Sequence, residues 1–443
     1  MKIALIQSYL GRPEKPVYPL GLCCLAAVIP EEHNIKIFDP NIYNEPYKEL
    51  ESNIKAFSPD LICLSLRNID STMRRDPFLY YKTLSPTINL CKQIVPNAKI
   101  VIGGSGFSMF ASEIMERHKE IDFGVFREGE DTLPELLNSI DDPDLVKGIF
   151  FRNGRELVFT GERPLPEIKN LPRPRRDLLD LKPYLGDIDT IGVLSKRGCS
   201  LKCAYCTYPY LNGSEIRARE PEDVVDEIEE LVKKYKVKDF IFVDPVFNIP
   251  KEHAEEICRS LIKRNLDVTW TAWINERNVD REFVKLALEA GCREFCFSSD
   301  GCSDVSLKEL GKNFQRKHVE ATLDFALDNP EMNVSYNFFL NPPGQTLEGF
   351  LWLVKFYIKA KKTLGSRLKG FCLGAPRIEP YTPIYKMALK SKMLNKDISL
   401  LPEKPEDLKK LFYVNKKTWY LDYVFILYRM ARWLKSIIRP HRG

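Results

Sequence analysis

Three of the twelve cysteines share one short segment at a spacing suited to metal chemistry. Cys199, Cys203 and Cys206 form a C-x3-C-x2-C pattern directly after an expected strand over 190–195, which places all three thiols on one loop. Three thiolates leave one iron of a [4Fe–4S] cluster open to an exchangeable ligand, and the amino and carboxylate groups of S-adenosylmethionine fit it. A structural zinc site needs four ligands, and the closest downstream histidine is His253. We therefore predict a cluster, rather than zinc or three unrelated buried cysteines.

The composition is typical of a globular protein with more than one domain. The 443 residues are too many for one ordinary core, and 44% hydrophobic with 29% charged residues argues against a disordered chain. The formal net charge of +5 is small and spread along the chain, so we expect no nucleic-acid partner. The first residues resemble a strand and a polar loop rather than a signal peptide. We expect a cytoplasmic protein whose scattered cysteines are reduced and pack as small hydrophobes.

Residues 1–140 alternate β-rich and helical patterns, which predicts a doubly wound, Rossmann-like parallel sheet of an α/β protein. In such a sheet a ligand binds beyond the carboxyl ends of the strands. The strands are expected at 2–8, 34–39, 61–66, 99–103 and 122–126. The helices are expected at 20–29, 47–57, 86–95, 111–118 and 132–139.

A second β/α series over 187–390 follows a small hairpin and a proline-rich linker at 141–186. Its six βα units predict a partial (β/α)6 TIM-like barrel with its chemistry at the carboxyl ends of the strands. The strands are expected at 190–195, 239–243, 268–273, 294–299, 333–340 and 370–375, and the helices at 221–235, 252–263, 281–290, 319–327 and 347–362. Residues 391–443 are expected to form a C-terminal helical segment, with one amphipathic helix over 418–438.

The cysteine motif, with Tyr205 just before its last cysteine, resembles that of the radical S-adenosylmethionine (radical SAM) enzymes. Segments 242–248, 297–304, 341–346 and 379–385 resemble later elements of the same superfamily, although each alone could be a turn or a cap. The resemblance implies that the cysteines hold the cluster and that Tyr205 packs against the cluster or the adenine, unless this aromatic residue belongs to the core. It also implies SAM contacts from four residues: Asp244, Asn248, Asp300 (where the family usually carries Glu) and Glu379.

A doubly wound domain ahead of such a barrel resembles the cobalamin-binding subfamily of these enzymes. The matching segments are 19–22, 65–70, 103–104 and 127–133. Glycines at strand ends allow backbone to approach a bulky corrin ring. The resemblance implies a cobalamin cofactor contacted by Ser65, Leu66, Arg67, Asn68, Gly103, Gly104, Glu128 and Gly129.

Many cobalamin proteins coordinate cobalt through the histidine of an Asp-x-His-x-x-Gly motif. None of the five histidines sits in one. The loop 65–70 would then face the cobalt, and Arg67 is the candidate, because a cation there disfavours a further metal ligand. The alternative is an arginine paired with Asp70 or Asp76 at the domain interface.

The two resemblances together imply a cobalamin-dependent radical SAM C-methyltransferase. Such an enzyme transfers a methyl group from SAM via methylcobalamin to an unactivated carbon of a small-molecule, peptide or lipid substrate. It draws on a low-potential electron donor of the flavodoxin or ferredoxin type. A cyclisation, a rearrangement and a polar methyl transfer stay open, as does a non-enzymatic Fe–S/cobalamin sensor. The C-terminal helix either packs over the barrel or makes a peripheral membrane contact.

Overall fold

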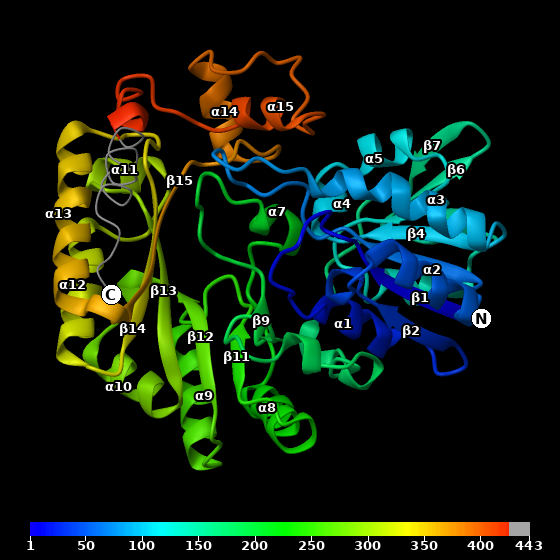
Figure 1. Cartoon of the computed structure of the whole chain (residues 1–443), viewed down its shortest axis with the longest axis horizontal. Helices are drawn as coiled ribbons and strands as arrows, with labels where there is room; N and C mark the ends of the chain where they lie inside the picture. The colour runs from blue at the N-terminus through cyan, green and yellow to red at the C-terminus, as the bar shows by residue number, and fades with distance from the viewer. Residues whose placement is uncertain (425–443) are drawn as a thin grey trace.

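The structure, a computed structural model, describes residues 1–424. Two β/α halves face each other, the N-terminal half on the right of Figure 1 and the later half on the left. The stretch 425–443 lies outside the described residues, and with it most of the helix expected over 418–438. None of the described helices combines the length and the apolar character that a bilayer span requires.

The N-terminal half is one seven-stranded sheet with the order β2-β1-β3-β4-β5-β6-β7. Its first five strands pair in parallel, which confirms the predicted doubly wound sheet. These strands are β1 (Lys2–Gln7), β2 (Asn34–Phe38), β3 (Leu61–Ser65), β4 (Lys99–Gly103) and β5 (Phe123–Val125). The helices are α1 (Leu20–Val28), α2 (Pro46–Phe57), α3 (Leu84–Ile94), α4 (Ser105–Met109), α5 (Ala111–Arg117) and α6 (Thr132–Asn138).

The hairpin expected within 141–186 belongs to this sheet. β6 (Ile149–Asn153) pairs antiparallel with β5, and β7 (Glu156–Phe159) pairs antiparallel with β6. Ile149, Phe150 and Phe151 are buried, so the hairpin covers the edge that β5 would otherwise expose. The sequence pattern located the hairpin but did not indicate which sheet it joins.

The later half is a six-stranded parallel sheet with the order β15-β14-β13-β12-β11-β8, which confirms the predicted partial barrel. In Figure 1 this sheet curves and the first domain faces its open side. The strands are β8 (Gly192–Val193), β11 (Asp239–Phe242), β12 (Thr269–Ile274), β13 (Cys292–Asp300), β14 (Asn333–Phe339) and β15 (Leu368–Gly374). The helices are α8 (Pro221–Tyr235), α9 (Lys251–Lys263), α10 (Arg281–Glu289), α11 (Asp304–Glu309), α12 (Arg316–Asp328) and α13 (Leu347–Leu364).

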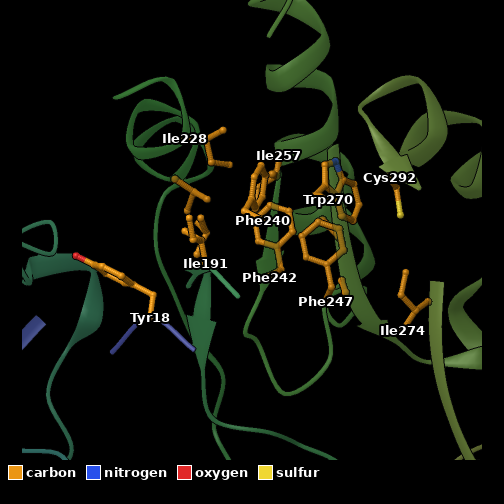
Figure 2. Packing of buried hydrophobic residues seen from close by; sticks show 14 of the residues in the cluster. Tyr18, Ile191, Ile228, Phe240, Phe242, Phe247, Ile257, Trp270, Ile274 and Cys292 are labelled. Carbon is orange, nitrogen blue, oxygen red and sulfur yellow. The ribbon is translucent and has the colours of Figure 1, made fainter. Parts of the chain in front are cut away.

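Aromatic residues fill the core of the barrel next to β11 and β12. Phe242 stacks on Phe247 with ring centroids 4.4 Å apart and meets Trp270 at 5.2 Å (Figure 2). The same buried cluster reaches Tyr18 of the first domain through Ile191. The two halves therefore share one continuous hydrophobic core, which fixes their relative position.

The chain after β15 contacts both halves. It contains α14 (Pro383–Lys390) and α15 (Pro405–Lys410), which lie at the top of Figure 1 between the two halves. The Tyr81 hydroxyl donates to the Pro402 carbonyl oxygen at 2.7 Å, and Arg117 pairs with Glu403 at 2.5 Å. This segment thus ties the first domain to the end of the barrel.

Candidate functional site

The segment that carries the three cysteines begins with a tight turn. It leaves β9 (Lys196–Arg197), which pairs antiparallel with β10 (Arg217–Ala218). Gly198 then adopts φ +82°, and an added Cβ would lie 1.7 Å from the carbonyl oxygen of Glu215. A side chain fits neither this conformation nor this space, so the position requires glycine.

Two distant segments hold the middle of the cysteine loop in place. The Ala204 N–H donates to the Leu310 carbonyl oxygen, and the Ala204 carbonyl oxygen accepts from the Ile384 N–H, both at 2.8 Å. Gly311 at φ +70° brings its Cα against Lys202, whose carbonyl oxygen lies 2.3 Å from an added Cβ. The turn after α11 and the start of α14 therefore hold the cysteine loop in place through backbone contacts.

The three thiols are partly buried on this loop. Burial, which disfavours the thiolate, raises the pKa of Cys199 and Cys203 above the ordinary value and that of Cys206 to about 11. The Cys206 Sγ accepts a hydrogen bond from the Tyr208 N–H at 3.4 Å. Iron supplies the positive charge that such thiols need in order to release their protons. Three thiols on one supported loop match the donor types of a [4Fe–4S] cluster. Among residues 1–424, however, no three Cys, His, Asp or Glu side chains are grouped closely enough to hold a metal ion, so the role of the thiols as ligands stays a prediction.

Tyr205 belongs to a buried polar network. Its hydroxyl donates to Asp300 Oδ2 at 2.5 Å, and its ring meets that of Phe339 edge to face at 4.9 Å. The Lys312 ammonium pairs with Asp300 and donates to the Tyr205 hydroxyl at 3.1 Å and to the Ser298 carbonyl oxygen at 2.8 Å. Lys312 and Asp300 are both nearly inaccessible, so each charge is neutralised by the other. The network attaches the cysteine loop to the end of β13.

Sequence reasoning missed Lys312 and a second buried residue, Glu276. The Glu276 carboxylate accepts from the Ser299 hydroxyl at 2.7 Å, and burial raises its pKa to about 7, against the opposing charge of Lys312. The glycine before Lys312 signals a tight turn, but its contact with the cysteine loop depends on long-range packing.

Asp244 and Asn248 bind the protein's own backbone. Asp244 accepts from the Ser195 N–H at 2.8 Å and from its hydroxyl at 2.5 Å, and it pairs with Lys196 at 3.0 Å. Asn248 exchanges two hydrogen bonds with the backbone of Asn275. Both side chains are almost fully buried, so in this structure they connect strand ends and present no free polar group. Their contact with SAM stays a prediction.

At the carboxyl edge of the first sheet, five predicted cobalamin contacts line one cavity of ≈ 250 Å³: Ser65, Gly103, Gly104, Glu128 and Gly129. Gly104 is required for the packing of the protein itself, whether or not cobalamin also contacts it. At φ +100° an added Cβ would lie 2.6 Å from the Leu66 carbonyl oxygen, so this glycine lets the loop after β3 close against β4. Leu66, the first residue of that loop, is buried.

Glu128 joins the two halves instead of remaining free for a ligand. Its carboxylate accepts from Arg197 at 2.8 Å and from Arg217 at 2.5 Å. Arg197 also donates to Glu130 at 2.5 Å. These charge-assisted hydrogen bonds attach the strand that precedes the cysteine loop to the edge of the first sheet.

Arg67 pairs with neither Asp70 nor Asp76, the two partners considered for it above. Asp70 pairs with Arg377 at 3.2 Å, and Asp76 pairs with Arg12 at 2.9 Å. Within residues 1–424 Arg67 forms no ion pair, and it is an exposed residue.

The Arg67 side chain lines a cavity of ≈ 160 Å³ together with groups from both halves. Asn68 comes from the same loop, Thr207 directly follows the last cysteine, and Glu379 follows β15. The structure therefore brings the predicted residues Arg67, Asn68 and Glu379 together beside the cysteine loop.

Two family models match the chain in succession. The model of the B12 binding domain matches residues 7–137, and the model of the Radical SAM superfamily matches residues 193–357. The chain therefore combines a B12 binding domain with a domain of the Radical SAM superfamily. Its cofactors are accordingly a [4Fe–4S] cluster, SAM and cobalamin.

Two relatives in sequence and one solved structure show what this chain is similar to. An uncharacterized methyltransferase of Pyrococcus horikoshii is 27% identical over 85% of this chain and 79% of its own length. An anaerobic magnesium-protoporphyrin IX monomethyl ester cyclase of Cereibacter sphaeroides is 26% identical over 60% of this chain, which spans 44% of the cyclase. The radical SAM methyltransferase TsrM of Kitasatospora setae, with cobalamin and a [4Fe–4S] cluster bound, has the same fold, with a TM-score of 0.76 and 20% identity over 94% of this chain and 84% of its own.

Proposed function

We propose that this enzyme transfers a methyl group from SAM, by way of cobalamin, to an unactivated carbon of a small-molecule substrate. The observation that carries the proposal is the shared cavity, which Arg67 lines from the first domain and Thr207 from the end of the cysteine loop. The bound cofactors supply methyl-group carriage and reductive cleavage of SAM. The protein then has to hold both cofactors close together and exclude water between them.

Arg67 is suited to the lower face of cobalamin. Arg67 has no carboxylate partner within residues 1–424, and this exposed residue lines the cavity. A guanidinium offers no lone pair to a metal, and its positive charge would disfavour a further ligand on cobalt. Arg67 therefore leaves that face without a protein ligand, and the absence of a motif histidine agrees with this role.

The network behind the cysteine loop keeps the loop in one orientation. Lys312 donates to the Tyr205 hydroxyl, which itself donates to Asp300, so a rotation of Tyr205 would take one hydrogen bond from each of two buried charges. Tyr205 is therefore a positioning residue in this proposal rather than a proton donor to substrate. An electron donor of the flavodoxin or ferredoxin type would reduce the cluster.

The test is anaerobic reconstitution with iron, sulfide and cobalamin, followed by incubation with SAM that carries a deuterated methyl group and a reductant. Formation of 5′-deoxyadenosine and labelled methyl groups on carbon supports the proposal. The Cys203→Ala variant should form neither product, whereas Cys91→Ala, which changes a cysteine of α3, should form both. Protein that retains iron but no corrin contradicts the methyl transfer while leaving the radical chemistry intact.

Cyclisation is the second candidate, because the cyclase of Cereibacter sphaeroides matches 281 residues of this chain. A cyclase would also form 5′-deoxyadenosine but would leave no label in the product. A sensor would form neither. The same experiment therefore separates the three functions.

A further inference from the structure

A cavity of ≈ 710 Å³, larger than the two already described, opens between the first domain and the far edge of the barrel. Its walls are the loop 72–76, the carboxyl end of β15 and residues 422–423. Met73, Leu373 and Tyr423 give it an apolar lining. The active-site cavities and this one thus lie along the same interface, because the loop that begins with Arg67 continues into residues 72–76.

The loop 72–76 brings two guanidinium groups to this cavity but no available carboxylate. Asp76 is bound by Arg12 at 2.9 Å. Arg75 donates to the Leu373 carbonyl oxygen at 3.0 Å. The partner of Arg74 comes from the far end of the described chain, where Asp422 Oδ2 accepts at 2.5 Å.

Asp422 is carried by a strap, residues 415–424, that is anchored before it reaches the cavity. The Thr418 hydroxyl donates to Asn341 Oδ1 at 2.6 Å, and the Asn341 amide donates back to the Thr418 carbonyl oxygen at 3.0 Å. Leu421 is buried in a cluster with Leu340 and Phe350. The strap can therefore release Asp422 from Arg74 without losing these anchors.

The Arg74–Asp422 pair is open to competition from solvent. The Arg74 side chain is 37% exposed and that of Asp422 is 15% exposed. An ion pair that water reaches contributes little free energy, so a carboxylate from solution can replace Asp422 at small cost. An uncharged group cannot, because it would leave the Arg74 charge uncompensated.

We propose that this cavity is the substrate site and that Arg74 binds a carboxylate of the substrate in exchange for Asp422. The substrate class is then a small amphipathic carboxylate whose apolar body lies against Met73, Leu373 and Tyr423. The inference rests on the proposed function, since it supplies the substrate of that reaction. Asp422 occupies the place of the substrate carboxylate until one arrives.

The test uses octanoate, octanol and octylammonium as probes with the full-length reconstituted enzyme, and isothermal titration calorimetry as the readout. We expect octanoate to bind at least tenfold more tightly than either other probe. Arg74→Met should abolish this preference. Asp422→Asn should tighten octanoate binding severalfold, because the competing carboxylate is gone.

Glu403→Gln serves as the matched control, because Glu403 pairs with Arg117 and Lys82 outside this cavity and its loss should leave octanoate affinity unchanged. Equal binding of all three probes, or weaker octanoate binding by Asp422→Asn, overturns the inference. Asp422→Asn keeps the test decisive if Arg74→Met does not fold. The formation of 5′-deoxyadenosine by the same preparations reports separately on the proposed function, so a failure of one is distinguishable from a failure of the other.

Discussion

Arg197 donates to Glu130 at 2.5 Å across the domain interface, two residues ahead of Cys199. The same guanidinium donates to Glu128 at 2.8 Å. The residue that leads into the cysteine loop is thus bound to the edge of the cobalamin-binding sheet. Together with the shared hydrophobic core, these contacts hold the two predicted cofactor sites at a fixed spacing.

Arg197→Met should destabilise the fold and loosen the cysteine loop. The substitution leaves Glu130 buried without a partner, and breaking a buried pair typically costs about 3–5 kcal/mol. Urea unfolding of the wild type and the variant measures the difference. Lys238→Met, which breaks an exposed pair with Asp267, should cost less than about 1 kcal/mol, and equal losses for both variants would contradict the role of Arg197.

Gly198→Ala should prevent the cysteine loop from forming and lower the iron content of the reconstituted protein. The added Cβ would lie 1.7 Å from the Glu215 carbonyl oxygen, so the backbone has to move. Gly161→Ala is the matched control, because Gly161 has a similar φ of +90° but nothing within 4 Å of its added Cβ. Iron and sulfide analysis compares the two, and retention of iron by Gly198→Ala would count against this account of the turn.

Arg67→Met and Arg377→Met should separate a functional arginine from a structural one. Arg67 has no ion pair within residues 1–424, so its loss should change the unfolding free energy by less than about 0.5 kcal/mol. Arg377 pairs with the buried Asp70, so its loss should cost about 3–5 kcal/mol.

The absorption spectrum of bound cobalamin supplies the second readout for Arg67. Arg67→Met should change the spectrum if Arg67 lies next to the cobalt as proposed, since the substitution removes its charge. An unaltered spectrum would assign Arg67 to some other part of the cavity.

Glu379 should make the stability of the protein depend on pH. Burial raises the pKa of this carboxyl to about 7, with Asp70 acting in the same direction and Arg377 against it. The unfolded carboxyl has a pKa of about 4.3, so between the two values only the folded protein keeps the proton. The proton on Glu379 contributes fully to the free energy of unfolding below the pKa of the unfolded carboxyl. This stabilisation, of up to about 3 kcal/mol, is lost as the pH rises through about 7.

Glu379→Gln should therefore match the wild type near pH 4.5 and exceed its stability at pH 8. Urea unfolding at both values measures the change. Glu331→Gln, at an exposed position, should follow the wild-type curve. A Glu379→Gln curve parallel to the wild type would show that Glu379 titrates normally.

The two sheets could be predicted from the sequence because each parallel strand is a short apolar run of its own. The expected ranges for β4 and α8 coincide with the observed ones, Lys99–Gly103 and Pro221–Tyr235. The place of β6 and β7 could not be predicted, because strand pairing is a long-range property. The hairpin pattern is the same whether it lies alone or completes a sheet.

The site was predictable only where residues lie close in sequence. The three cysteines are recognised by their spacing alone. Lys312 binds Tyr205 and Asp300, and Glu128 binds Arg197 and Arg217. These partners lie far apart in the sequence, so their contacts could not be predicted from it. The close approach of Gly104 to the Leu66 carbonyl oxygen could not be predicted either, and its contact with cobalamin stays a prediction.

The six-stranded barrel is open on one side, and the first domain covers that side. Tyr18 and Trp270 belong to one continuous hydrophobic core, so a hinge rotation of the first domain away from the barrel would have to break that core. We therefore expect substrates to enter between the two halves, where the cavities are lined by residues of both. Local changes along that seam, rather than a large domain motion, would then govern which molecules reach the reactive centre and how well water is kept from it.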